Sequence, residues 1–186
     1  LYLSFHPTAQ TGGGSTYNLI PWISKGTPTS NPLAFNPYDL GQFVSPESLD
    51  HAELSFTMQM LLPQEDTNLA GLSFRMTDPR NRYAVESDGS KLYLSKYVNG
   101  TRTVLTSTNF IIQPKTDYTF VIKAKGTRIQ VFVGGVPYFD ITDNTFASGK
   151  FGPFSTKPYV DFSNISRKQL SEPTVDWFTN FAIWEE

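Results

Sequence analysis

The sequence contains no cysteine and only two histidines, His6 and His51. Without cysteine the chain has no disulfide framework, no thiolate nucleophile and no cysteine-ligated zinc or iron–sulfur centre. Two histidines leave very few options for a catalytic triad or a histidine-rich metal site. The sequence also has neither the His-Glu-x-x-His run of zinc proteases nor the Gly-x-Ser-x-Gly turn of serine hydrolases. We therefore expect each histidine to be a loop or strand-start residue.

Charged residues are also scarce, at 17% of the 186 residues, against about a quarter in an average globular domain. The 15 Lys+Arg and 17 Asp+Glu give a net charge of -2, and no basic block could neutralise a run of phosphates, which disfavours nucleic-acid binding. No apolar run approaches the roughly 20 residues that span a bilayer, and the chain does not start with a basic segment followed by an apolar one. We expect a soluble chain without membrane insertion and, since it lacks an initiator methionine, a mature form or an excised domain.

Aromatic residues, in contrast, are abundant. They make up 15% of the chain, with 15 Phe and 9 Tyr, and these residue types favour β-strands. The 13 Gly and 13 Pro are spread along the chain and interrupt it repeatedly. Within residues 52–60, Leu54, Phe56 and Met58 alternate with Ser55 and Thr57. This period of two predicts a strand with one buried face.

Similar runs predict about a dozen strands in all. They cover residues 1–6, 19–24, 52–60, 69–77, 82–87, 91–98, 101–106, 118–125, 127–133, 137–141, 159–163 and 174–184. Between them, Asp88-Gly89 and Asn99-Gly100 are typical of hairpin turns. Short strands with turn signals at roughly 8–12-residue spacing predict an all-β antiparallel β-sandwich. We expect a single domain over residues 1–186, with an irregular N-terminal part (1–50) and regular strands (51–186).

Several of these runs resemble, in the same order, the central hairpins and return strand of concanavalin A-like (laminin-G-like) jelly-roll domains. The runs are residues 70–75 (AGLSFR), 81–85 (NRYAV), 92–96 (LYLSK), 99–100 (NG), 118–122 (YTFVI), 129–135 (IQVFVGG), 140–143 (DITD) and 148–152 (SGKFG). Within this superfamily the chain is most similar to bacterial carbohydrate-binding modules of the levan-binding type, and to the related domain of sugar hydrolases. The resemblance covers about residues 52–183. It implies a concanavalin A-like jelly roll with a binding site on loops or on a concave sheet face, often with a structural calcium ion.

The sequence departs from that family in its last strands. Such domains commonly end with a strand of the type v-x-F-D-N-v, whereas this chain has FSN at residues 162–164 and FTN at 178–180. Neither run has the aspartate that would carry calcium there. Elsewhere, Asp140, Asp143 and Asn144 place three oxygen-bearing side chains within five positions. Calcium takes six to eight oxygen ligands from such loops, so these three are the candidate metal ligands; the alternative is that they cap their own turn.

Sugar binding needs a flat apolar ring to stack on the C–H face of the sugar, with fixed donors and acceptors nearby. Aromatic residues in polar, turn-rich surroundings are therefore the candidates, although any one of them is more often ordinary packing. Tyr93 and Tyr97 alternate with Leu92 and Leu94, so they face the other side of their strand from the leucines. The candidate carbohydrate-binding residues are Trp22, Tyr38, Arg80, Asn81, Tyr83, Tyr93 and Tyr97.

Catalytic acids are harder to find in the sequence. Glucanases that share this jelly roll place carboxylates on alternate residues of one strand, and retention needs the pair about 5–5.5 Å apart. The nearest match is Glu86-x-Asp88, but Asp88 lies in a predicted turn and no third acid follows it. We therefore predict no catalytic residue, although a fold can bring distant acids together.

These observations predict a non-catalytic carbohydrate-binding domain that recognises a polysaccharide or oligosaccharide. We expect it to be attached to other domains in a larger extracellular, cell-surface or phage-tail protein. A first alternative is a glycoside hydrolase of the same jelly-roll superfamily that uses acids from distant strands. A second is an adhesion module that binds protein through its loops. The main prediction, a carbohydrate-binding domain, rests on analogy of fold and on the missing catalytic groups.

Overall fold

The computed structural model of the chain describes residues 2–5, 20–23, 41–60, 69–156 and 160–170. These residues form thirteen β-strands and no helix, and hence no helix that could cross a membrane. The predicted strand over residues 174–184 lies outside the described residues. In chain order the strands are β1 (Tyr2–Phe5), β2 (Ile20–Ile23), β3 (Gly41–Val44), β4 (Ala52–Met60), β5 (Ala70–Asp78), β6 (Asn81–Ser87), β7 (Lys91–Val98), β8 (Thr101–Asn109), β9 (Asp117–Lys125), β10 (Arg128–Val133), β11 (Val136–Thr142), β12 (Lys150–Ser155) and β13 (Val160–Gln169).

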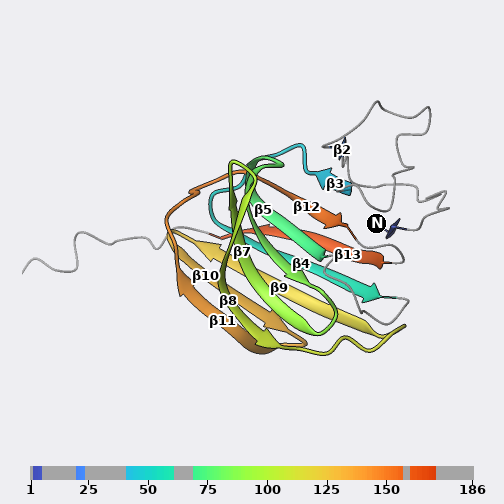
Figure 1. Cartoon of the computed structure of the whole chain (residues 1–186). Helices are drawn as coiled ribbons and strands as arrows, with labels where there is room; N and C mark the ends of the chain where they lie inside the picture. Colours follow the sequence, from blue (N-terminus) through green and yellow to red (C-terminus); the bar gives the residue numbers. More distant parts are fainter. Residues whose placement is uncertain (1, 6–19, 24–40, 61–68, 157–159, 171–186) are drawn as a thin grey trace, which may run out of the picture.

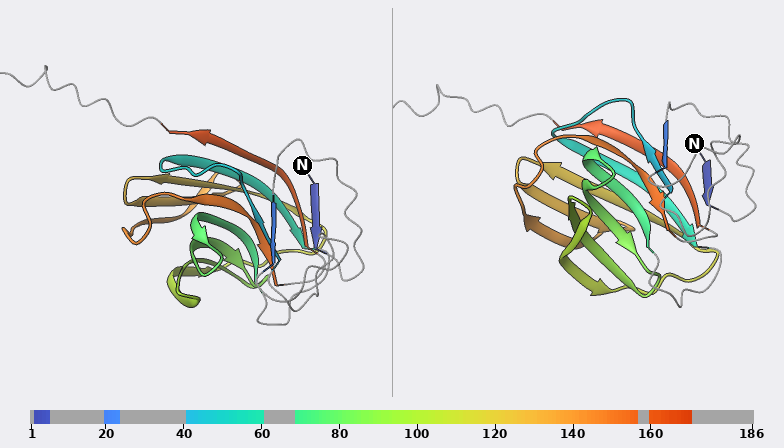
Figure 2. Two further views of the ribbon diagram at one scale, coloured as in Figure 1. Left: turned by 90° about the horizontal axis from the view of Figure 1, so that it is seen from above. Right: turned by 45° about the horizontal axis from the view of Figure 1, so that its top comes forward.

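The strands form two antiparallel sheets. Sheet A has six strands in the order β1-β13-β4-β9-β10-β11, and sheet B has seven in the order β2-β3-β12-β5-β6-β7-β8. The two sheets lie over each other as curved layers (Figure 1 and Figure 2). This arrangement is the antiparallel jelly-roll sandwich that the sequence predicted, so the predicted fold class is confirmed.

The core between the sheets is built from the apolar half of each alternating strand. In β4, Leu54, Phe56 and Met58 are all buried. Phe56 stacks on Phe120 of β9, with ring centroids 4.8 Å apart and an interplanar angle of 9°. On the other side of β4, the ring of Phe162 in β13 lies 6.2 Å from that of Phe56. The inward residues of β4 thus join three neighbouring strands of sheet A.

Strands β5 to β8 form a meander in sheet B, joined by tight turns. Asn99 and Gly100 both have positive φ, 53° and 86°, as a two-residue type I′ turn requires. At the other predicted hairpin, the Asp88 carboxylate accepts bonds from the backbone N–H groups of Ser90 and Lys91, both at 2.8 Å. Both predicted turns are confirmed, and together they set the register of β6, β7 and β8.

The first fifty residues supply strands to both sheets. β1 pairs with β13, while β2 pairs with β3, and β3 with β12. Alternation predicted β1 and β2 but neither β3 nor β12, since β3 is only four residues long and β12 contains Gly152 and Pro153. For β12, only the family resemblance implied a return strand. Gly152 is required where β12 approaches β3, because a Cβ there would lie 1.9 Å from the carbonyl oxygen of Phe43.

We predict that Phe56→Ala lowers the free energy of unfolding by about 3–5 kcal/mol, because it leaves a cavity beside two rings in a packed core. Phe132→Ala is the matched control. Phe132 is a half-buried ring on the outer face of sheet A, and its loss should cost about 1 kcal/mol. Urea unfolding of both variants tests this. Equal losses would show that Phe56 does not occupy the core position described.

Candidate functional site

The outer face of sheet B carries a group of polar and aromatic side chains. In β6 and β7 the inward residues, including Tyr83 and Leu94, belong to the core, so the residues between them face outward. The outward-facing group, which we call the sheet B site, consists of Arg82, Glu86, Tyr93, Ser95, Tyr97 and Arg102, with Phe154 of β12 beside it. Arg82 and Glu86 are buried even on this face, with 2% and 1% of their surface exposed.

Glu86 is the anion at the centre of the site. Its carboxylate accepts a hydrogen bond from Arg102 Nε at 2.7 Å and one from the Tyr97 hydroxyl at 2.9 Å. The strand register pairs Arg82 with Tyr97, Ala84 with Ser95 and Glu86 with Tyr93. To reach Glu86, the Tyr97 side chain therefore extends past the Ala84–Ser95 pair. Burial and the negative charge of Glu86 raise the pKa of Tyr97 above its usual range, so the hydroxyl keeps the proton that it donates.

Arg82 is the second cation of the site and has fewer partners. Its guanidinium carbon lies 3.8 Å from the ring centroid of Tyr97 and 5.1 Å from that of Phe154. One terminal N–H donates to the carbonyl oxygen of Pro79, but Nε has no hydrogen-bond partner. Desolvation lowers the pKa of Arg82, although Tyr97 and Glu86 act in the opposite direction. Ser95 Oγ is the other buried polar atom of the site without a partner.

Tyr93 is held at the edge of the site by the turn that follows β6. Its hydroxyl donates to Asp88 Oδ2 at 2.6 Å, and the Arg102 guanidinium carbon lies 4.8 Å from its ring centroid. Desolvation, together with the negative charge of Asp88, raises the pKa of Tyr93 to about 12. The pKa of Asp88 is lowered, because its hydrogen bonds from Tyr93, Ser90 and Lys91 outweigh desolvation, which acts to raise it. The Tyr93 ring is thus fixed by the same carboxylate that shapes the turn.

Of the predicted sugar-binding residues, the structure brings Tyr93 and Tyr97 together in this site. Tyr83, in contrast, lies on the core face of β6 and is fully buried. It stacks on Phe74, with centroids 5.4 Å apart, and its hydroxyl donates to Asp143 at 2.5 Å. No part of its ring is free to stack on a sugar in this structure.

Arg80 and Asn81 lie at the end of sheet B, where they connect two turns. Arg80 donates to the carbonyl oxygen of Asn99 at 2.8 Å. The Asn81 amide donates to Asp78 at 2.8 Å and its oxygen accepts from the Asn99 N–H at 2.9 Å. Both residues therefore have structural partners, and Arg80 is also exposed to solvent.

The two remaining predicted sugar-binding residues lie in the first fifty positions. Trp22 belongs to β2 and is in register with Gln42 of β3, but its side chain is not among those the structure describes. Tyr38 lies outside the described residues. The structure therefore leaves their predicted roles as predictions.

The three candidate calcium ligands do not form a cation site as they lie. Asp140 pairs with Arg128 on the neighbouring strand, at 2.8 Å and 2.5 Å for its two oxygens. Asp143 already faces a cation, since Lys96 Nζ lies 2.8 Å from its Oδ2. Among the described residues no group of three or more His, Cys, Asp or Glu is arranged to hold a metal. With both carboxylates neutralised by side-chain cations, Asn144 is left without acidic partners, and the three residues do not fit a calcium ion.

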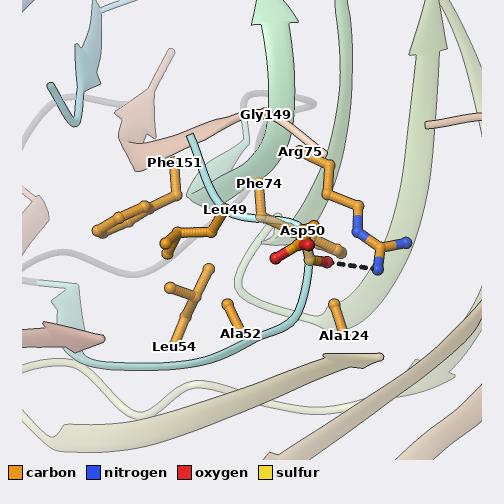
Figure 3. Close-up of a pocket in the computed structure, with 9 residues that line it drawn as sticks. All are labelled: Leu49, Asp50, Ala52, Leu54, Phe74, Arg75, Ala124, Gly149 and Phe151. Carbon is orange, nitrogen blue, oxygen red and sulfur yellow. Dashed lines mark hydrogen bonds between the residues drawn. The ribbon is translucent and has the colours of Figure 1, made fainter. Parts of the chain in front are cut away.

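A separate cavity lies between the sheets at the end of β4 and β5 (Figure 3). Its walls are mostly core side chains, and its two charged members are Asp50 and Arg75. Arg75 has an unusual positive φ of 46°. Arg75 donates to the carbonyl oxygens of Asp50, at 2.8 Å, and Phe146, at 3.1 Å. The guanidinium therefore joins two loops across the sandwich. Because the cavity offers few polar groups, it lacks the donors and acceptors that a sugar needs.

Sequence analysis did not single out Arg82, Ser95, Arg102 or Phe154 as binding residues, and considered Glu86 only as a catalytic acid. The sequence did contain one signal that Arg82 and Glu86 lie on the outer face: they alternate with Tyr83 and Val85 in β6. This alternation places them on the outer face, as it does Tyr93 and Tyr97 in β7. Phe154 had no comparable signal, because it lies in β12, which alternation did not predict.

We predict that Asp143→Asn lowers the free energy of unfolding at pH 7 by about 2 kcal/mol, because the carboxylate bonds to a lysine and a tyrosine are lost. Desolvation raises the pKa of Asp143, but its bonds from Lys96, Thr145 and Tyr83 outweigh this and lower it below 3.8. Its contribution is therefore complete above pH about 4 and is lost as pH falls further. Urea unfolding from pH 7 to pH 3 should show the difference between wild type and Asp143→Asn narrowing, with Asn144→Ala as the unaffected control. A difference that stays constant over this range would contradict the assignment.

We also predict that a chelator leaves the Tm unchanged, because Arg128 and Lys96 already neutralise the two candidate carboxylates. Differential scanning fluorimetry with EDTA and with added calcium tests this. A Tm that rises with calcium concentration would show a calcium site.

The fold has known counterparts, although no family model and no curated protein sequence matches the chain. The carbohydrate-binding module CBM66 from Bacillus subtilis superimposes with a TM-score of 0.63 at 18% identity, covering 82% of this chain and 98% of the module. Sheep galectin-11 gives a TM-score of 0.52 at 10% identity, with 68% and 97% covered. A glycosidic hydrolase gives 0.54 at 13% identity, with 78% and 74% covered. The chain therefore has the jelly-roll fold shared by carbohydrate-binding modules and galectins, as the sequence resemblance implied.

Proposed function

We propose that the protein is a non-catalytic carbohydrate-binding domain whose ligand, a polysaccharide or oligosaccharide, binds at the sheet B site. The observation that carries this proposal is the placement of Tyr93 and Tyr97 beside Glu86 and Arg102 on one outer sheet face. The two rings offer apolar surfaces for sugar stacking. The partly exposed guanidinium of Arg102 offers fixed donors for sugar hydroxyls, and the buried carboxylate of Glu86 holds it in place.

Several of these groups are accessible enough to meet a ligand. Tyr93 and Tyr97 are half-buried, and the Arg102 side chain keeps 31% of its surface exposed. The fold shared with a carbohydrate-binding module, as the name of CBM66 describes it, supports the class of function by analogy. We further propose that the domain belongs to a larger extracellular, cell-surface or phage-tail protein that uses it to attach to a glycan.

The alternative, a glycoside hydrolase, is less well supported by the acids of this face. A general acid needs a raised pKa, whereas the pKa of Asp88 is lowered by its hydrogen bonds. Glu86 is buried and already accepts bonds from Arg102 and Tyr97, so it is not placed to protonate a glycosidic oxygen. These contacts favour binding over hydrolysis, and the neighbouring glycosidic hydrolase shows only that the fold is compatible with catalysis.

We predict that the protein binds a polysaccharide without releasing sugar from it, and that Tyr97→Ala weakens binding at least about tenfold, because a stacking ring is lost. Affinity electrophoresis against levan, β-glucans and bacterial cell-wall glycans, with product sugars assayed in parallel, tests this. Phe132→Ala is the control, since it removes a half-buried ring from the outer face of the other sheet and should leave binding unchanged. Released sugar would make the protein an enzyme, and loss of binding only in Phe132→Ala would move the site to sheet A.

A further inference from the structure

We propose that the ligand is an acidic glycan, and that its carboxylate or sulfate group binds the buried guanidinium of Arg82. This inference rests on the proposed function, since it names the chemical class of the ligand at the sheet B site. Arg82 is a buried cation that forms no ion pair with any residue in the described part of the chain. Within the described part of the chain, Arg102 pairs with Glu86 and Lys96 with Asp143, but no carboxylate lies within ion-pair distance of Arg82.

A buried cation without a counterion is costly unless its donors are used. Arg82 is 2% exposed, and it has one bond to the Pro79 carbonyl and a vacant Nε–H. Stacking between the rings of Tyr97 and Phe154 stabilises the cation, but rings do not satisfy an N–H directed to an in-plane acceptor. Each buried group left unsatisfied in a native protein needs an explanation, and an absent ion or ligand is one of them.

A second vacant group lies on the same face. The Ser95 hydroxyl is fully buried and has no partner, and the register places Ser95 between the Arg82–Tyr97 and Glu86–Tyr93 pairs. Its neighbour across the strands is Ala84, so the sheet carries only small side chains at this point. Arg82 Nε and Ser95 Oγ are thus two donors without partners on one sheet face, and a ligand reaches them only when the Tyr97 ring moves aside.

The charge of the site favours an anion over a neutral sugar. The site has two guanidinium groups, Arg82 and Arg102, and two carboxylates, Glu86 and, at its edge, Asp88. Glu86 pairs with Arg102 and Asp88 binds Tyr93 and its own turn, so Arg82 is the cation of the site that has no ion-pair partner among the described residues. Guanidinium groups bind carboxylate and sulfate oxygens with charge-assisted hydrogen bonds, which are stronger than bonds to hydroxyls. A uronic acid and a sulfated sugar share this chemistry.

The arrangement also shows what a ligand must displace. The Tyr97 ring lies against Arg82 and its hydroxyl is bonded to Glu86. When an acidic residue of the glycan binds Arg82, its neighbouring hydroxyls can replace the tyrosine hydroxyl on Glu86. The ligand then supplies acceptors to Arg82 Nε and Ser95 Oγ. Its hydroxyl replaces the hydrogen bond that Glu86 loses when the Tyr97 hydroxyl leaves.

The first test compares polymers that differ only in charge. We expect polygalacturonate to bind at least about tenfold more tightly than its fully methyl-esterified form, with an affinity that falls as NaCl rises from 50 to 300 mM, because the ester removes the anion and salt screens the contact. A sulfated galactan and its desulfated form make the second arm, which distinguishes sulfate from carboxylate as the group bound. If levan or another neutral glycan binds as tightly as both acidic polymers, the inference fails and the proposed function stands. If no glycan binds at all, both fail.

The second test removes the cation. Arg82→Gln should abolish the preference for the acidic polymer, whereas Arg82→Lys should retain part of it, since it keeps the charge without the planar donors. Arg128→Gln removes one cation from the outer face of sheet A and should leave the preference intact. Circular dichroism and Tm establish that each variant is folded. An Arg82→Gln protein that is folded and still prefers the acidic polymer would overturn the assignment, and the comparison of esterified and free polymers decides the question should that variant fail to fold.

Discussion

The structure depends on the burial of one face of each sheet against the other. Because side chains alternate along a strand, packing Leu54, Phe56 and Met58 inward leaves their neighbours on the outside of sheet A, and the same holds for β6 and β7 in sheet B. The core thus decides which residues are presented outward. Tyr93 and Tyr97 face outward because Leu92 and Leu94 are packed in the core.

Alternation made much of this predictable. The strands from β4 to β11, both hairpin turns and the outward position of Tyr93 and Tyr97 all follow from residue order within one strand or one hairpin. Features that depend on contacts between distant segments were not visible. β12 was missed by alternation because its pattern is broken by Gly152, whose reason is the close backbone of β3. The ion pair of Asp143 could not be predicted, because its partner, Lys96, is 47 positions away in the sequence.

Tyr83 shows that polar sequence neighbours alone do not predict whether a side chain faces solvent. Its neighbours Asn81 and Arg82 are polar and a turn lies close by, which are the features that made it a candidate sugar-binding residue. The strand register decides otherwise, since Tyr83 is one position out of phase with the outer face and joins Phe74 and Phe146 in the core. Arg82, its neighbour, takes the outward position. A shift of one residue exchanges the two faces of a strand, so the phase of a strand matters more for a binding site than the chemistry of its surroundings.

The two tyrosines of the sheet B site differ in how they are held. The Tyr93 hydroxyl is bonded to Asp88, a residue that also shapes the hairpin turn, so folding itself fixes this ring. Conformational entropy lost on folding is not lost again on binding, and Tyr93 can therefore contribute its full contact area to a ligand. Tyr97 is bonded to Glu86, which the proposed ligand would also bind. The Tyr97 ring therefore has to move, and to be held in a new position, each time a ligand binds. Under the proposed function, the site would combine one rigid surface with one adaptable surface, a pairing suited to sugar units of different shape along one glycan.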